Sequence, residues 1–228
     1  FIIANTGRPG PVLIDIPRDV FTEEFDFDNN FWNEEIKILG YNPPKFADNS
    51  KIDSALKLIE QSNRPVILAG HGIIISRAYE ELLELAEKAQ IPVITTLLGI
   101  SSFPENHILS LSFPGMHGVA WASLALDQAD LVVAIGSRFD DRITGDTSRF
   151  ATQSKKIHID IDPAEINKNI NVDVALIGNA KDILNQMLPK LKKKTHIDWL
   201  DHIAKLKQDH PSLKLKKSND LTGQYVIK

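Results

Sequence analysis

The architecture is most evident in the residues Pro65-Val66-Ile67-Leu68-Ala69-Gly70-His71-Gly72, an apolar run that ends in a Gly-His-Gly turn. A continuous apolar run of this length, without alternation between polar and apolar residues, is typical of a strand buried on both faces. Such strands belong to parallel sheets that carry helices on both sides. The two glycines fit either a plain turn or a place where a ligand approaches the backbone.

Similar apolar runs recur along the chain, and segments with helical periodicity separate them. We expect strands at 11–17, 65–69, 92–97, 131–136, 156–161 and 172–177. Helices are expected from a capping box of Ser50 and Asp53, from Ser76 to about Ala89, from about Val119, from Pro163 and after Asn179. The last five strands alternate with helices, so the sequence predicts an α/β fold, a doubly wound parallel sheet with helices on both faces.

Composition and charge exclude several classes of function. The chain has 228 residues, no cysteine and a net charge of −4. It therefore has no disulfides, no thiolate nucleophile and no sulfur-ligated metal, and its charge provides no basic field for nucleic acid. No apolar run approaches the roughly 18 residues that cross a membrane. Three histidines, His71, His107 and His158, share no metal-ligand spacing, so we expect no metal site in this chain.

Ligands of doubly wound sheets bind outside the carboxyl ends of the strands. The polar and glycine-rich segments at those ends are 70–72, 95–97, 136–142, 160–162 and 178–179, to which the loop 113–118 is added. Their glycines, hydroxyls, carboxylates and arginines suit a dinucleotide-sized ligand, although each feature alone also fits a structural role. Ile75 replaces the third glycine of the dinucleotide fingerprint, and Thr95 and Thr96 end the next strand where an acid is expected, which argues against an NAD dehydrogenase.

Four motifs resemble a known family. The segment Gly7-Arg8-Pro9-Gly10-Pro11-Val12, with the residues as far as Val20, resembles the end of the pyrimidine-binding domain of thiamine-diphosphate-dependent 2-oxoacid decarboxylases and carboligases. The segments Pro114-Gly115-Met116-His117-Gly118, Arg138-Phe139-Asp140-Asp141-Arg142 and 157–163 (Ile-His-Ile-Asp-Ile-Asp-Pro) are similar to the acetolactate synthase large (catalytic) subunits within that family. The first motif is shared across the superfamily, and the second and third are more specific.

The resemblance implies a domain organisation. Enzymes of this family have a pyrimidine-binding, a central and a diphosphate-binding domain. Residues 1–20 would be the C-terminal end of the first domain, 21–48 a linker, 49–192 the central FAD-binding domain, and 193–228 a connection toward the third. The aromatic residues of the linker either pin it to a neighbouring domain or lie in a solvated loop. The chain begins with Phe1 rather than Met, and we interpret it as an internal part of a longer polypeptide.

The resemblance also implies a set of FAD contacts. Carried over motif by motif, they are Arg8, Gly70, Gly72, Thr96, Leu97, Pro114, Gly115, Met116, His117, Gly136, Ser137, Arg138, Phe139, Asp140, Asp160, Ile161, Asn179 and Ala180. No catalytic residue is expected in this chain, but Asp141 and Arg142 are expected near the substrate channel. Three positions depart from the family pattern: Asn179 stands where Asp is usual, 111–113 is Leu-Ser-Phe rather than Leu-Gly-Met, and 100–102 is Ile-Ser-Ser.

The implied function is that of acetolactate synthase. Such an enzyme decarboxylates pyruvate and adds the product to a second 2-oxoacid, pyruvate or 2-oxobutanoate, in branched-chain amino-acid biosynthesis. It uses thiamine diphosphate, Mg²⁺ and FAD, assembles as a homodimer or tetramer with a small regulatory subunit, and occurs in the bacterial cytoplasm or the plastid stroma. No Gly-Asp-Gly motif for the Mg²⁺ diphosphate occurs in the sequence, so we expect this chain alone to be inactive. Alternatives are pyruvate oxidase, another carboligase, and a non-enzymatic nucleotide-binding module.

Overall fold

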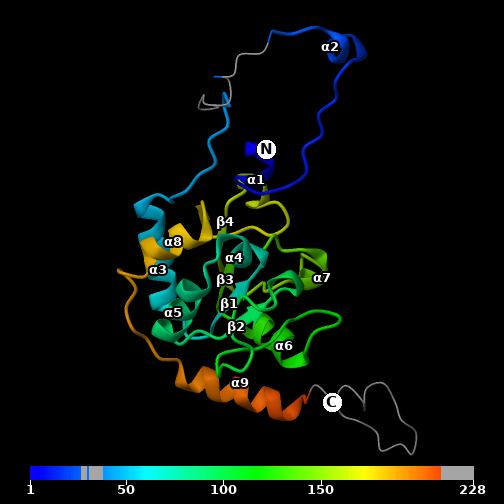
Figure 1. Ribbon diagram of the computed structural model, residues 1–228. Helices are drawn as coiled ribbons and strands as arrows, with labels where there is room; N and C mark the ends of the chain where they lie inside the picture. The colour runs from blue at the N-terminus through cyan, green and yellow to red at the C-terminus, as the bar shows by residue number, and fades with distance from the viewer. Residues whose placement is uncertain (27–29, 31–37, 212–228) are drawn as a thin grey trace, which may run out of the picture.

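A five-stranded parallel sheet forms the centre of the computed structural model, which describes residues 1–26, 30 and 38–211 (Figure 1). The strands are β1 (Pro65–Ala69), β2 (Val93–Thr95), β3 (Leu131–Ile135), β4 (Lys155–Asp160) and β5 (Val174–Ile177). Their order in the sheet is β2-β1-β3-β4-β5, and every neighbouring pair is parallel. All residues of β1, β2 and β3 are buried, as their continuous apolar runs predict. The predicted fold class is confirmed.

Helices cover both faces of the sheet. One face packs against α3 (Asn49–Gln61), α4 (His71–Ser76), α5 (Tyr79–Ala89) and α8 (Ala180–Met187), and the other against α6 (Ala120–Gln128) and α9 (Ile197–Asp209). Strand residues alternate between the two cores: Ile67 faces the first, and Val66 and Leu68 face the second. Figure 1 shows α9 along the lower end of the unit, away from the N-terminal residues.

Shorter elements complete the described chain. They are the helices α1 (Ile2–Asn5), α2 (Arg18–Thr22) and α7 (Asp141–Thr144) and the 3₁₀ turns η2 (Leu97–Gly99) and η3 (Pro163–Glu165). None of the helices in the described residues is long and apolar enough to cross a membrane.

The predicted strand at 11–17 is wrong. The structure describes this segment without a strand, and Leu13 and Ile14 are 92% and 76% exposed. An apolar run forms a parallel strand only when a neighbouring strand supplies its hydrogen bonds, and no described strand pairs with this segment. The aromatic rings of Phe21 and Phe25, in the segment expected to be the linker, are also exposed, whereas Phe27, Phe31 and Trp32 lie outside the described residues.

Two helix starts also differ from the prediction. The first helix begins after Asp48, not Ser50, because the Asp48 carboxylate accepts the Ser50 N–H at 2.7 Å and suits the positive end of the helix. Ser76 ends α4 rather than capping a longer helix, since its hydroxyl donates to the Gly72 carbonyl at 2.7 Å and Arg77 follows in a left-handed conformation. The helix α9 was not predicted, and it extends the packed unit beyond residue 192.

Candidate cofactor site

A pocket of about 490 Å³ opens at the carboxyl ends of the strands. The chain enters β1 first, then places β2 on one side of it and β3 on the other, so the strand order reverses between β1 and β3. Loops that leave two neighbouring strands in opposite directions create a crevice, and ligands of doubly wound sheets bind there. The residues that follow all five strands contribute to the lining.

Glycines hold the backbones close together at this reversal. The Gly70 N–H donates to the Ile135 carbonyl at 2.9 Å, and the Gly72 N–H donates to the Gly136 carbonyl at 3.1 Å. A Cβ atom at Gly72 would lie 2.6 Å from the Cα atom of Gly136, and one at Gly70 would lie 2.1 Å from the Gly136 oxygen. Side chains are therefore excluded here, and backbone alone forms this wall of the pocket.

The loop after β3 supplies the charged groups of a second wall. Asp140 caps α7 by accepting the Arg142 N–H at 3.1 Å, and it also forms an ion pair with Arg138. The hydrogen bond from the Arg142 N–H, together with the charge of Arg138, holds the pKa of Asp140 below its ordinary value. Arg142 itself forms a loose pair with Asp141, 3.9 Å apart, and both side chains are largely exposed.

Two titratable groups lie at the end of β4: His158 is buried, and Asp160 lines the pocket. His158 Nε2 donates to the Ser137 carbonyl at 2.8 Å, and its Nδ1 has no partner among the described residues. Burial lowers the pKa of His158, although the nearby Asp160 and the bond to Ser137 oppose this shift. Burial raises the pKa of Asp160, whose carboxylate accepts the Asp162 N–H at 2.9 Å.

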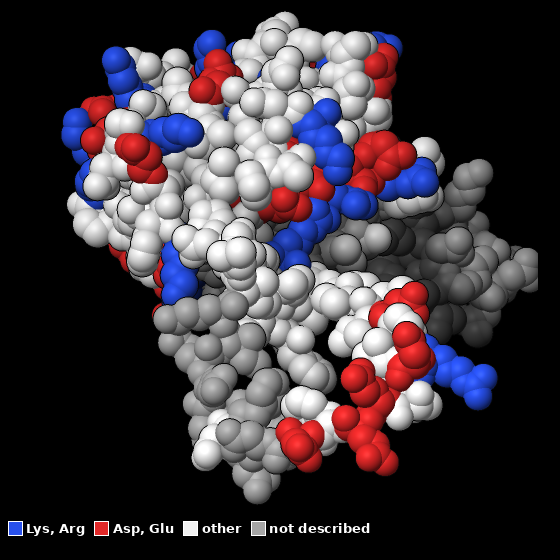
Figure 2. Space-filling model, turned by 90° about the horizontal axis from the view of Figure 1, so that it is seen from above, with Lys and Arg blue, Asp and Glu red and all other residues white. Residues whose placement is uncertain are grey.

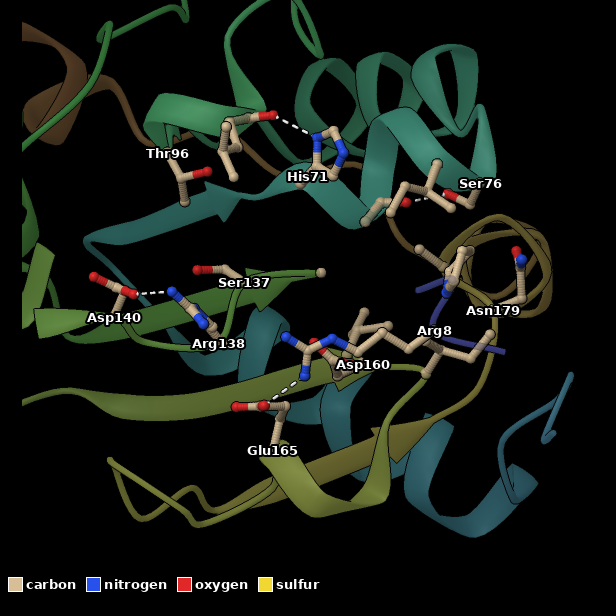
Figure 3. A pocket seen from close by; sticks show the side chains of 18 of the residues that line it. Arg8, His71, Ser76, Thr96, Ser137, Arg138, Asp140, Asp160, Glu165 and Asn179 are labelled. Atoms are coloured by element: carbon tan, nitrogen blue, oxygen red, sulfur yellow. Dashed lines mark hydrogen bonds and ion pairs between the residues drawn. The ribbon is translucent and has the colours of Figure 1, made fainter. Parts of the chain in front are cut away.

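Arg8 reaches the pocket from the N-terminal segment. Its Nη1 donates to Glu165 Oε1 at 2.5 Å and to Asp162 Oδ2 at 3.0 Å, so residues about 155 positions apart in the sequence meet at one rim. Asn179, which follows β5, caps α8 by accepting the N–H groups of Lys181 and Asp182. Figure 3 shows the side chains converging from separate elements, with Thr96 and Asp140 on one side of the view and Ser76 and Asn179 on the other.

Most residues that the family pattern suggested for FAD lie together in this pocket. Twelve of the eighteen line it: Arg8, Gly72, Thr96, Leu97, Gly136, Ser137, Arg138, Asp140, Asp160, Ile161, Asn179 and Ala180. Arg142 also lines it, whereas Asp141 does not.

Six suggested contacts are not in the lining: Gly70, Pro114, Gly115, Met116, His117 and Phe139. Gly70 packs against Gly136, and Phe139 is buried with its ring edge-to-face on Phe150 and His158. The loop 114–118 lies against α7, since a Cβ atom at Gly115 would be 2.3 Å from the Arg142 carbonyl oxygen. Met116 is 82% exposed. The roles of these residues stay predictions.

The pocket also contains residues that the sequence did not suggest. Ser76, Leu98 and the buried Glu165 line it. The Leu98 carbonyl accepts a hydrogen bond from His71 Nδ1 at 2.8 Å. The one available signal for Glu165 was its place just after a strand end, in the turn that Pro163 opens.

The chemistry of the lining fits a flavin dinucleotide. The volume lies in the usual range for small-molecule sites, roughly 300–1,000 Å³. The glycine wall lets a ligand reach the backbone, the arginines Arg8 and Arg138 suit a diphosphate, and Thr96, Ser137 and Asp160 can bind hydroxyl groups.

The described residues contain no cluster of three or more His, Asp or Glu side chains that could hold a metal ion. Acidic and basic side chains are intermixed on the upper part of the face seen in Figure 2.

Comparison with known protein families agrees with the fold. Residues 52–187 match the family described as the thiamine pyrophosphate enzyme, central domain. The chain therefore belongs to the thiamine pyrophosphate enzymes and contains their central domain.

Individual proteins of that family are similar to this chain over most of its length. The chain is 49% identical over 211 residues to a probable acetolactate synthase large subunit of Methanocaldococcus jannaschii, covering 91% of this chain and 36% of the relative. It is 46% identical over 220 residues to a probable acetolactate synthase large subunit of Methanococcus aeolicus, covering 91% and 37%. It is 44% identical over 233 residues to the acetolactate synthase large subunit of Corynebacterium glutamicum, covering 100% and 37%. The chain thus spans somewhat more than a third of the length of these relatives.

Proposed function

We propose that this chain is part of the large, catalytic subunit of an acetolactate synthase. The enzyme would decarboxylate pyruvate and join the product to a second 2-oxoacid, giving 2-acetolactate from pyruvate or 2-aceto-2-hydroxybutyrate from 2-oxobutanoate. The observation that carries the proposal is 44–49% identity, over at least 91% of this chain, to proteins with that name. Such products precede the branched-chain amino acids.

The role proposed for the described pocket is to bind FAD. Its glycine wall, its arginines Arg8 and Arg138 and its hydroxyl-binding side chains suit the diphosphate and the ribityl and ribose hydroxyls of that cofactor. Decarboxylation followed by carbon–carbon bond formation involves no net oxidation, so FAD would have a structural role. It would stabilise the fold around the strand ends by binding the folded state alone.

Thiamine diphosphate would supply the electron sink for the decarboxylation. In this family a Gly-Asp-Gly motif, which the present sequence lacks, holds it with Mg²⁺, and a glutamate of the first domain activates its thiazolium ring. Those sites would lie in other parts of a longer polypeptide, so we expect residues 1–228 alone to be inactive.

Arg142 is the residue of this chain proposed to meet the second 2-oxoacid. It lines the pocket next to Ile143, and its weak pairing with Asp141 leaves the guanidinium available to a carboxylate. A guanidinium binds a carboxylate through two parallel hydrogen bonds and so orients as well as attracts it.

The proposed assembly is that of the relatives that are named large subunits. It would comprise a dimer or tetramer of large subunits with a small regulatory subunit. Relatives occur in bacteria such as Buchnera aphidicola and in the alga Porphyra purpurea, so the bacterial cytoplasm and the plastid stroma are both proposed locations.

The proposal is tested by a product assay on the full-length protein with thiamine diphosphate, Mg²⁺ and FAD. With pyruvate alone we expect carbon dioxide and acetolactate in equal amounts, and with added 2-oxobutanoate we expect 2-aceto-2-hydroxybutyrate as well. Acetyl phosphate with consumption of oxygen would identify a pyruvate oxidase instead. Carbon dioxide without a carboligation product would also contradict the assignment.

A further inference from the structure

Glu165 is a buried carboxylate on the rim of the pocket, and Arg8 is its principal partner. The glutamate is 5% exposed, and its Oε1 accepts from Arg8 Nη1 at 2.5 Å and from Lys168 Nζ at 3.1 Å. Burial alone would raise the pKa of Glu165, but the hydrogen bonds from Arg8 and Lys168 outweigh it and hold the pKa below its ordinary value. Glu165 is therefore an ionised acceptor inside the protein.

The bonds to Arg8 leave one edge of its guanidinium available. A guanidinium carries five N–H donors, two on each Nη and one on Nε. Both carboxylate partners of Arg8, Glu165 and Asp162, bind the same nitrogen, Nη1. The edge formed by Nη2 and Nε can bind a phosphate through two parallel hydrogen bonds, and no described residue is hydrogen-bonded to it.

The orientation of the Arg8 guanidinium matters for ligand binding because Arg8 lines the pocket. The residue comes from the N-terminal segment, its side chain is 45% exposed, and it lines the pocket together with Glu165 and Asp160. Figure 3 shows its side chain running along the pocket with the guanidinium directed at Glu165. A long side chain that is half exposed has many rotamers, and fixing it before a ligand arrives lowers the entropy lost on binding.

From these contacts we propose that Glu165 is a positioning residue, which holds Arg8 by Nη1 so that its Nη2/Nε edge binds the diphosphate of the dinucleotide. The inference rests on the proposed binding of FAD. The second oxygen of Glu165, Oε2, is buried without a partner among the described residues. Such an oxygen costs stability. Asp162 also binds Arg8 Nη1, but its carboxylate has a second task, because it caps η3 by accepting the Ala164 N–H.

The test is a double-mutant cycle on the full-length protein, with dissociation constants measured for FAD and for riboflavin, which lacks the diphosphate. We expect Glu165→Gln to raise the dissociation constant of FAD about tenfold, the scale of one charge-assisted hydrogen bond. Arg8→Met should raise it at least as much, and the double variant no more than Arg8→Met alone, since both changes remove one interaction. Riboflavin binding should be unchanged throughout.

Glu81→Gln is the matched control. Glu81 is also buried, also has an unpartnered Oε2 and pairs with one lysine, Lys181, at 3.3 Å, but it does not line the pocket. This variant should bind FAD like the unmodified protein. Should Glu165→Gln not fold, Asp162→Asn removes the negative charge of the other carboxylate bound to Arg8 Nη1 and should weaken the binding of FAD but not of riboflavin.

Three results would overturn the inference: unchanged FAD affinity in Glu165→Gln, losses that add in the double variant, or an equal loss of riboflavin affinity. Failure of the unmodified protein to bind FAD would instead refute the proposed cofactor, and the role of Glu165 would fall with it.

Discussion

His158, in β4 beneath the pocket, combines full burial with a titratable ring. One ring nitrogen donates to the Ser137 carbonyl and the other has no partner among the described residues, so the neutral form fits and the charged form does not. Burial is the main reason that its pKa lies below the ordinary value of 6.5. The imidazole thus fixes the backbone that follows β3, where Ser137 and Arg138 line the pocket.

This pKa shift makes stability depend on pH. Below about pH 6.5 the unfolded chain binds a proton at this position that the folded protein does not bind, so the free energy of unfolding falls as the pH is lowered, by up to about 1.4 kcal/mol per pH unit. The raised pKa of Asp160 has the opposite sign, because above its ordinary value of 3.8 the folded protein keeps a proton that the unfolded chain has released. Urea unfolding of the full-length protein between about pH 8 and pH 6 measures the fall.

The variant His158→Gln identifies the source of this pH dependence. It should flatten the curve, leaving a smaller slope from His196, whose pKa burial also lowers. An unmodified protein whose stability does not change over this range, or a variant with the full slope, would contradict the assignment.

Arg142 is the residue through which the proposed substrate role can be separated from a structural one. Arg142→Lys keeps the charge but removes the two-pronged geometry, so acetolactate formation should fall while carbon dioxide release from pyruvate and flavin content persist. The expected loss corresponds to about 1.5–3 kcal/mol, as for a hydrogen bond to a charged group. All three quantities are measured on one preparation. A parallel fall of all three would show that Arg142 is structural.

At the scale of elements, α8 joins the sheet to the pocket through its N-cap. Asn179 accepts two N–H groups of the first turn, and the buried side chains of Ile183, Leu184 and Met187 pack the helix on the core. Its place after β5 puts the start of the helix at the rim of the pocket. Helix and site therefore depend on the same residue.

Two substitutions test this cap. Asn179→Ala should lower the free energy of unfolding by about 1 kcal/mol, the usual value of an N-cap. Asn179→Asp, which introduces the residue usual in the family, should match or exceed the original stability, because a carboxylate is favourable at a helix N-terminus. Urea denaturation measures both. Equal stability of the Ala variant would show that the cap contributes nothing.

The elements that the sequence predicted are those with strong local signals. Continuous Val, Ile and Leu runs located the five strands of the sheet, and Asn179 located the start of α8. The segment 11–17 has the same local pattern but no described strand beside it, so local pattern alone misleads there. Helix α9 was missed because its buried residues, Trp199, Ile203 and Leu206, are few among charged neighbours in a lysine-rich region.

In the candidate site too, residues with a local sequence signal were predicted, and contacts between distant residues were not. Strand ends indicated the residues at Gly72, Gly136 and Asp160, since the fold brings every strand end to one edge. The pairing of Arg8 with Glu165 joins residues 157 positions apart, and no local pattern encodes it. Phe139 was assigned to the ligand through its motif, but its aromatic ring packs into the core.

At the scale of the whole molecule, the sheet is a scaffold, and the pocket at its strand ends is the proposed place of a ligand. The pocket draws on all five strand ends and on the N-terminal segment, so a molecule bound there would contact all of them at once. A ligand that binds only the folded state stabilises it by mass action. Stability and cofactor occupancy should therefore change together.

The most direct measurement is equilibrium urea unfolding of the flavin-free full-length protein at increasing FAD concentration, with NAD as the control dinucleotide. At one hundred times the dissociation constant, FAD should raise the free energy of unfolding by about 2.7 kcal/mol, with one FAD bound per chain, and NAD should have no effect. An unfolding curve that FAD does not move, or that NAD moves equally, would contradict the claim that this pocket is a flavin site.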